Sequence, residues 1–424
     1  MSLASSPIAL VLVLALGLGL ATTGCGAKKG APAGAGSGAC VARMGLITNL
    51  QTSTGRELAR ALELGRDEIN ASGGVAGCKI ELTVKSDDAE DGKARATARE
   101  LLDLPGLWAL FGTDNSATTI TVMDAAERAQ VPFLVPATSS ALAGAPGHAW
   151  AFRFAAPDYA LVAGLFDFLT PLVPTLGLRS IAVVYPHTAS SLGRFVNVQD
   201  EARARGLAVV VAEEYGRGTT DFRRQLTQVK WASPDVVILD ADHAGPHDDL
   251  RALLEQAREL DLSPKLFLTT SNILGDSSAA GLDYVVSSAQ WTEDAPWRDE
   301  QKRGGADFRK AYSARFGDAP GFRAVSAYVA LQVVRRALEG SKGSGAPDWS
   351  SPAAIRARLR DGLRATDLRD TLFGPIRFDA SGQNDHPVLV AQVQGMTRTL
   401  VHPALGGGAA GRLAAPVPPW KERP

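Results

Sequence analysis

The chain has 424 residues, of which 45% are apolar and 21% are charged, and its formal net charge is -1. This length is enough for roughly two or three domains with a sizeable core. With this near-neutral charge, nothing in the composition resembles the strongly basic footprint that is typical of a nucleic-acid-binding protein. Beyond the N-terminus, no apolar run reaches the length of a transmembrane helix.

The first residues predict an export signal. A short apolar run, IALVLVLALGLGL at residues 8–20, is followed by small residues and Cys25. This arrangement resembles a bacterial lipoprotein signal, in which the cysteine becomes the lipidated first residue of the mature protein. We therefore expect a signal peptide at residues 1–24, lipidation of Cys25 and a flexible Gly/Ala-rich tether at residues 25–39. A plain secretory signal is the alternative, since no Lys or Arg precedes the apolar run.

Short apolar runs alternate with amphipathic stretches from residue 41 onward. The runs are rich in β-branched residues, as in strands that are buried on both faces. The stretches between them repeat apolar residues at helical spacing, as in GRELARALELGRDEINASGG, which ends at a Gly pair. The predicted strands are residues 41–47, 79–85, 107–111, 132–135, 181–185, 208–211, 236–239 and 266–269.

Strict alternation of strands and helices predicts an α/β fold with doubly wound parallel sheets. The pattern occurs twice, so we expect two lobes joined by crossing strands, with a cleft between them. The first lobe would comprise residues 40–153 and 285–380, the second residues 154–284 and 381–403, followed by a flexible tail at 404–424. Ligands bind outside the carboxyl ends of the strands in such sheets, so both lobes would present these ends to the cleft.

The ordered set of motifs resembles the type I periplasmic binding proteins, and within them the branched-chain amino acid receptors of ABC importers. The resemblance covers most of the mature chain. It rests on RMGLITNLQTSTGRELARALELGRDEINASGGVAG, LFGTDNSATTITVMDAAERAQVPFLVPATSSALAG, AWAFRFAAPD, IAVVYPHTASSLGRFV, TTDFRRQLTQVKWASPDVVIL, FRKAYSARFGDAPGFRAVSAYVALQVV and FGPIRFDASGQN. It implies a binding protein rather than an enzyme.

The resemblance implies a carboxylate site in the first lobe. A Gly-x-x-x-Ser turn and a later Ala-Thr pair hold the α-carboxylate of an amino acid in this family, and here they are Ser116 and Ala137-Thr138. Thr113 in that turn and Ser139 beside the pair add hydroxyl groups, and a helix beginning at this turn favours an anion. Thr52 and Ser53 would line the cleft from the first loop. Ordinary helix capping is the alternative role for each of these residues.

The second lobe departs from the family pattern. Leu192 stands where a Tyr often forms an aromatic wall, and Asn272 lies near the usual position of a Glu that holds the ligand amine. Asp240 or Asp242 could replace that Glu, because a carboxylate is the natural partner of an ammonium group. Trp291 is a candidate aromatic wall, with packing in the core as its alternative role. A negatively charged wall at Asp240 and Asp242 would favour a ligand that carries a cation.

Cys40 and Cys78 are the remaining cysteines, and each opens a predicted strand. In an exported protein, two such cysteines predict a disulfide bond, because parallel neighbouring strands start side by side. The alternative is a pair of free thiols.

His243 and His247 lie among Asp240, Asp242 and Asp248 and so raise the possibility of a metal site. Gly245-Pro246 separates the two histidines and opposes a helix through both, so we expect no metal and no cofactor. Neither a Gly-x-Ser-x-Gly elbow nor a phosphate-binding loop occurs in the mature chain.

The sequence thus predicts a periplasmic, membrane-anchored lipoprotein receptor. It would bind a small molecule of the amino-acid kind, deliver it to an ABC permease and make no contact with nucleic acid. Either membrane could hold the anchor. A sensory or regulatory lipoprotein with the same fold is the second hypothesis, and an enzyme is the third.

Overall fold

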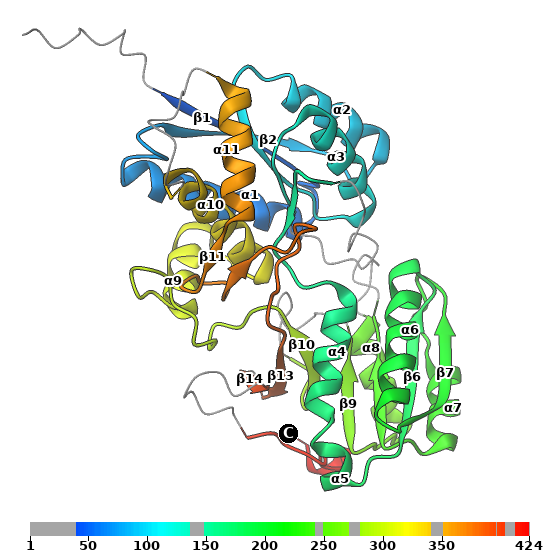
Figure 1. The fold of residues 1–424 in the computed structure, drawn as a ribbon. Coiled ribbons are helices and arrows are strands. Elements are labelled where there is room, and N and C mark those ends of the chain that lie inside the picture. The colour runs from blue at the N-terminus through cyan, green and yellow to red at the C-terminus, as the bar shows by residue number, and fades with distance from the viewer. Residues whose placement is uncertain are drawn as a thin grey trace, which may run out of the picture. The chain divides into compact units, whose positions relative to one another are not determined.

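A computed structural model describes residues 40–135, 148–241, 249–270, 280–340, 351–395, 397–402 and 412–423. Two large sheets are present in this part of the chain, together with a small two-stranded one. Each large sheet has helices on both of its faces (Figure 1).

The first sheet is parallel throughout, with the strand order β2-β1-β3-β4-β5. Its strands are β1 (Val41–Thr48), β2 (Lys79–Ser86), β3 (Leu107–Gly112), β4 (Phe133–Val135) and β5 (Ala151–Arg153). The strands that were predicted over this region are confirmed to within one residue at each end. The central strand β3 is buried along its whole length, as its uninterrupted apolar sequence predicts.

The helices of the first lobe cover opposite faces of this sheet. On one face lie α1 (Ser53–Ala71), α9 (Gly305–Phe316), α10 (Phe322–Glu339) and α11 (Pro352–Arg364), and on the other lie α2 (Asp91–Leu102) and α3 (Ser116–Ala129). Met44 and Leu46 pack into the first of these cores and Ile47 into the second, because successive residues of a strand point to opposite faces. The short strands β11 (Asp367–Leu368) and β12 (Ile376–Arg377) pair beside them.

The second sheet has the order β14-β13-β10-β9-β8-β6-β7. Its parallel strands are β6 (Ser180–Pro186), β7 (Ala208–Tyr215), β8 (Val236–Leu239), β9 (Leu266–Thr269) and β10 (Val285–Ala289). Two antiparallel strands complete it, β13 (Leu389–Gln394) and β14 (Thr397–His402). Every strand that was predicted in this lobe is present.

Helices again cover both faces of the second sheet. The helices α4 (Asp158–Leu169) and α6 (Ala189–Ala204) share one core, with α5 (Leu172–Leu176) at its margin, while α7 (Arg223–Ala232) and α8 (Asp249–Glu259) share the other. The apolar residues of β6 alternate between the two cores, with Ile181 and Val183 in the first and Ala182 and Val184 in the second.

Three crossing segments connect the lobes, and amide side chains hold them together. Gln290 accepts a hydrogen bond from the Ala156 N–H at 2.7 Å and donates one to the Ala156 carbonyl at 3.1 Å. Gln383 accepts from Arg153 Nε at 2.6 Å and donates to the Ala155 carbonyl at 2.9 Å. His386 Nε2 lies 2.7 Å from the carbonyl of Gln290, so all three segments belong to one buried polar network.

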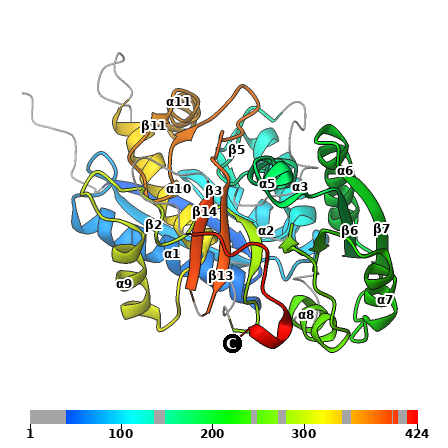
Figure 2. The ribbon, with the colours of Figure 1, turned by 90° about the horizontal axis from the view of Figure 1, so that it is seen from below.

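The predicted domain boundaries need two corrections. We placed residues 285–380 in the first lobe, but β10 pairs with β9 and β13 and therefore belongs to the second sheet. We also predicted a flexible tail at 404–424, whereas residues 412–423 pack against the second lobe (Figure 2). Val417 N donates to the Lys265 carbonyl at 2.9 Å, and Trp420 Nε1 donates to the Leu262 carbonyl at 2.8 Å.

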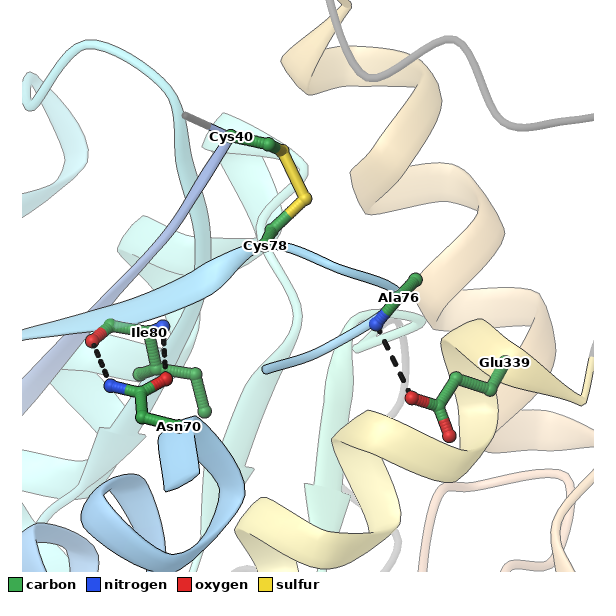
Figure 3. The surroundings of a disulfide bond; sticks show 6 residues. All are labelled: Cys40, Asn70, Ala76, Cys78, Ile80 and Glu339. Atoms are coloured by element: carbon green, nitrogen blue, oxygen red, sulfur yellow. Dashed lines mark hydrogen bonds between the residues drawn. A yellow bond between two sulfur atoms is a disulfide. The ribbon is translucent and has the colours of Figure 1, made fainter. Parts of the chain in front are cut away.

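A disulfide bond joins Cys40 to Cys78 at the amino-terminal ends of β1 and β2, with a Cα–Cα distance of 4.5 Å (Figure 3). Close by, the Asn70 side chain makes a two-point contact with the backbone of Ile80, donating at 3.0 Å and accepting at 2.7 Å. Because β2 is an edge strand, these bonds satisfy backbone groups that no further strand covers.

Candidate ligand-binding site

The first-lobe part of the candidate site lies where β3 leads into α3. Asn115, the residue before the helix, accepts hydrogen bonds from the N–H groups of Ala117 and Thr118 at 2.8 and 3.4 Å. Two of the free N–H groups at the start of α3 are therefore already capped. Ser116 is half-buried, and within the described residues its hydroxyl has no hydrogen-bond partner. Ser116 is thus the residue of this turn that can still bind an anion.

Thr113 does not have the predicted role. Its side chain is completely buried, and its hydroxyl contacts the Thr119 hydroxyl at 2.7 Å, the Thr118 hydroxyl at 3.0 Å and the Asn115 carbonyl at 2.7 Å. This network fixes the turn from the inside. Thr113 therefore stabilises the turn, and its hydroxyl is not exposed.

The loop after β1 lies directly beside this turn, because β1 and β3 are neighbours in the sheet. Thr52 is the N-cap of α1 and accepts from the Gly55 N–H at 2.9 Å, while Ser53 is exposed. Asp114 reaches across from the β3 side to this loop and accepts from the Asn49 N–H at 2.8 Å. The structure therefore brings Thr52 and Ser116 to one edge of the first sheet.

In the second lobe, Asp240 lies at the carboxyl end of β8 and is only 2% exposed. Arg194 on α6 binds it through two nitrogens, with Nη2 2.9 Å and Nε 3.2 Å from Oδ2. Oδ1 also accepts from the Ala241 N–H at 3.1 Å. The prediction that Asp240 offers its charge to a cationic ligand is therefore wrong, since an arginine of the same lobe already neutralises it.

Leu192 lies on the first turn of α6 and is 53% exposed, and Val196 one turn later is 47% exposed. The N-cap residue Thr188 accepts from the Ser191 N–H at 3.1 Å and so closes the start of this helix. Leu192 is therefore accessible, and its place in the wall of a binding site stays a prediction.

Trp291 follows the second crossing segment and is 6% exposed. It packs in the core of the first lobe against the start of α9, where a Cβ on Gly305 would lie 2.9 Å from the Trp291 ring. Trp291 therefore packs in the core, which was its alternative role, and does not form an exposed aromatic wall.

Several predicted residues lie outside the described part of the chain: Ala137, Thr138, Ser139, Asp242, Asn272 and Cys25, together with His243 and His247. Among the described residues, no group of three or more His, Cys, Asp or Glu side chains is arranged to hold a metal ion. None of the described helices is both long and apolar enough to cross a membrane.

Two residues of the second lobe that were not predicted from the sequence, Arg194 and Tyr215, contact Asp240. Arg194 bridges Asp240 and, at 3.9 Å, Asp158 at the start of α4. The Tyr215 hydroxyl lies 3.2 Å from the Asp240 carbonyl and 3.1 Å from Asp249, and it shares its single proton between these two acceptors. A buried carboxylate at the end of a strand normally needs a cationic partner. A search of the sequence for such a cation could have identified Arg194 in SSLGRF.

Comparison with known proteins identifies the family. Residues 43–398 match the periplasmic binding protein family. Among curated relatives, "Leu/Ile/Val-binding protein homolog 8" of Brucella abortus is 26% identical over 347 residues, covering 79% of this chain and 83% of that protein. "Leu/Ile/Val-binding protein homolog 7" of Brucella suis is 28% identical over 352 residues, with coverages of 78% and 82%.

Solved structures show the same fold. An ABC transporter substrate-binding protein from Desulfitobacterium hafniense in complex with Leu has a TM-score of 0.69 and 22% identity, covering 85% of this chain and 99% of that chain. A solute-binding protein of R. palustris in complex with benzoate has a TM-score of 0.68 and 15% identity, covering 85% and 95%. The chain therefore belongs to the periplasmic binding protein family, a family of binding proteins rather than of enzymes, and has the type I fold of two α/β lobes.

Proposed function

We propose that this protein is an extracytoplasmic receptor that closes around a small carboxylic acid, an amino acid or a related compound, and delivers it to an ABC permease. Ligand binding between the lobes would shift the population toward a closed state, which the permease then recognises. The observation that carries the proposal is the family match over residues 43–398.

The ligands of the structural neighbours support a carboxylate. Four of these neighbours are complexes with Leu, isoleucine, benzoate and 3,4-dihydroxybenzoic acid. These compounds differ in size, aromatic character and the presence of an amine, but each is a carboxylic acid. A carboxylate is therefore the chemical group that we expect this chain to bind as well.

Ser116 is the described residue that fits this group best. It begins α3, where the helix dipole favours negative charge, and its hydroxyl has no partner among the described residues. We propose that Ser116, with Ala137, Thr138 and Ser139, which follow β4 in the sequence, receives the ligand carboxylate. Thr52 and Ser53 would line the same lobe, and Leu192 the other. Asp240 is not assigned to a ligand amine, because Arg194 neutralises it.

Thermal-shift screening tests the proposal. A carboxylic acid such as L-leucine or benzoate should raise the melting temperature in proportion to the logarithm of its concentration, because it binds only the folded chain. Ser116→Ala should weaken binding about tenfold or more, since it removes a hydrogen bond to a charged group. Ser72→Ala, at an exposed position beyond the other end of α1, serves as the matched control. Stabilisation only by divalent metals, or by no compound of this class, would contradict the proposal.

We further propose that Cys25 carries a lipid that anchors the receptor to a membrane on its periplasmic side. The support is the apolar run and small residues that precede it. In cells, the native chain should sediment with membranes, whereas Cys25→Ala should be found in the soluble extracytoplasmic fraction or retain its signal peptide. Equal distributions of the two proteins would show that the chain has no lipid anchor at this residue.

A further inference from the structure

The carboxyl ends of β1 and β3 approach each other closely. Gly112, the last residue of β3, has φ +118°, and a Cβ there would lie 1.9 Å from the Ile47 carbonyl oxygen. Gly55, in the first turn of α1, is equally confined, because its Cβ would lie 2.0 Å from the Asn49 carbonyl oxygen. Both positions therefore require glycine, and together they let the loop after β1 fold tightly against the turn after β3.

Asp114 uses this proximity. Its Oδ1 accepts from the Thr48 hydroxyl at 3.0 Å and from the Asn49 N–H at 2.8 Å. The Thr52 hydroxyl lies 3.0 Å from Oδ2 and 2.9 Å from the Asn49 carbonyl, and it shares its single proton between these two acceptors. One carboxylate thus holds the end of β1 and the N-cap of α1.

Other common roles of an aspartate at this position are already excluded. Asn115, not Asp114, caps α3. None of the ion pairs in the described residues includes Asp114. Its partners are neutral hydroxyl and amide donors at residues 48–52, the end of β1 and the loop that follows it.

We infer that Asp114 is a positioning residue for ligand binding, which holds the loop at 49–52, including Thr52, at a fixed distance from Ser116. This inference rests on the proposed function, since Ser116 matters here as the carboxylate site. Asp114 acts through hydrogen bonds and not through its charge, because a negative charge near a bound carboxylate would repel it. An asparagine can supply the same oxygen to Asn49 and an N–H to the Thr52 hydroxyl, so it should preserve the geometry.

The test compares Asp114→Ala with Asp114→Asn in the full chain. Amide hydrogen exchange at Asn49 should be at least tenfold faster in Asp114→Ala, and affinity for L-leucine or benzoate should fall about tenfold. Asp114→Asn should restore slow exchange and at least native affinity. Asp91→Ala is the control. Asp91 is the first residue of α2, and its carboxylate accepts a hydrogen bond from Thr121. This substitution should change neither the exchange rate at Asn49 nor the affinity for the two acids.

Each outcome decides between the two proposals. Unchanged exchange at Asn49 in Asp114→Ala, or an Asp114→Asn protein that behaves like Asp114→Ala, would overturn the positioning role. A second outcome is faster exchange at Asn49 in Asp114→Ala, while the native protein binds neither acid. This result would confirm the contact between Asp114 and the loop, but it would overturn the proposed function and the inferred role of Asp114 in binding.

Discussion

Arg194 and Asp240 form an ion pair in which the side chains are 12% and 2% exposed. Removing two charges from water is costly, and the pair persists because the guanidinium and the carboxylate meet through several hydrogen bonds. Ser191 also accepts from Arg194 Nη2 at 2.9 Å, so the arginine connects the start of α6 to the end of β8.

Arg194→Met should lower the free energy of unfolding by about 3 kcal/mol, because it leaves the buried Asp240 carboxylate without its cation. Urea unfolding at neutral pH measures this loss. Arg224→Met is the matched control, since Arg224 pairs with Glu213 but is 68% exposed, and it should cost less than about 1 kcal/mol. Adding Asp240→Asn to Arg194→Met should recover part of the loss. Similar losses for the two arginines would contradict this account.

For Asp240, the sequence predicted the position at the end of a strand but not the ion pair with Arg194. The apolar run before it identifies the end of a strand, and local patterning is enough for that. Its partner lies 46 residues earlier in the chain, on a helix whose orientation depends on how the sheet is packed. The positions of Thr52 and Ser116 at the starts of helices were predictable, because helix starts and strand ends are marked by local sequence. The bonds of Asp114 to the end of β1 and the first loop depend instead on a long-range contact.

Secondary structure elements were predicted more reliably than their assignment to lobes. Strands such as β8 and β9 are buried on both faces, so their sequences contain uninterrupted apolar runs with clear ends. The run that forms β10 has the same character. Apolar sequence shows that a strand is buried but not in which sheet, and β10 was therefore placed in the wrong lobe.

The C-terminal segment shows a different limit. RLAAPVPPWKER contains the proline and alanine that are typical of a linker, and composition alone therefore suggested a free tail. A few anchors are enough to order it. Val417 is buried, and the Trp420 ring packs 5.6 Å from that of Phe267, while Gln392 makes two hydrogen bonds to the backbone of Ala414.

For the whole molecule, stability should depend on pH through His386 in the third crossing segment. It is 6% exposed, stacks on Phe373 and contacts the Gln290 carbonyl. Burial lowers the pKa of its imidazole from 6.5 to about 4. The imidazole therefore stays neutral in the folded chain at pH values where it is protonated in the unfolded chain.

The sign of the effect follows from this difference. Stability from the neutral His386 is complete above the unfolded pKa and is lost as the pH falls from about 6.5 toward 4, a loss of about 3 kcal/mol. His386→Gln, which can still donate to Gln290, should flatten this part of the pH profile of unfolding free energy. His187→Gln, at a side chain that is 82% exposed, should leave the profile nearly unchanged. A native profile that is flat between pH 7 and 4 would contradict the prediction.

The disulfide at the start of the fold also has a mechanical consequence. Residue 39 ends the stretch that we propose as a membrane tether, so tension on that tether would enter the fold at Cys40. The bond to Cys78 divides such a load between β1 and β2, which pair along their whole length. Detaching β1 from this end would then require either breaking a covalent bond or pulling out two strands together, so a tether at this end would load two strands instead of one.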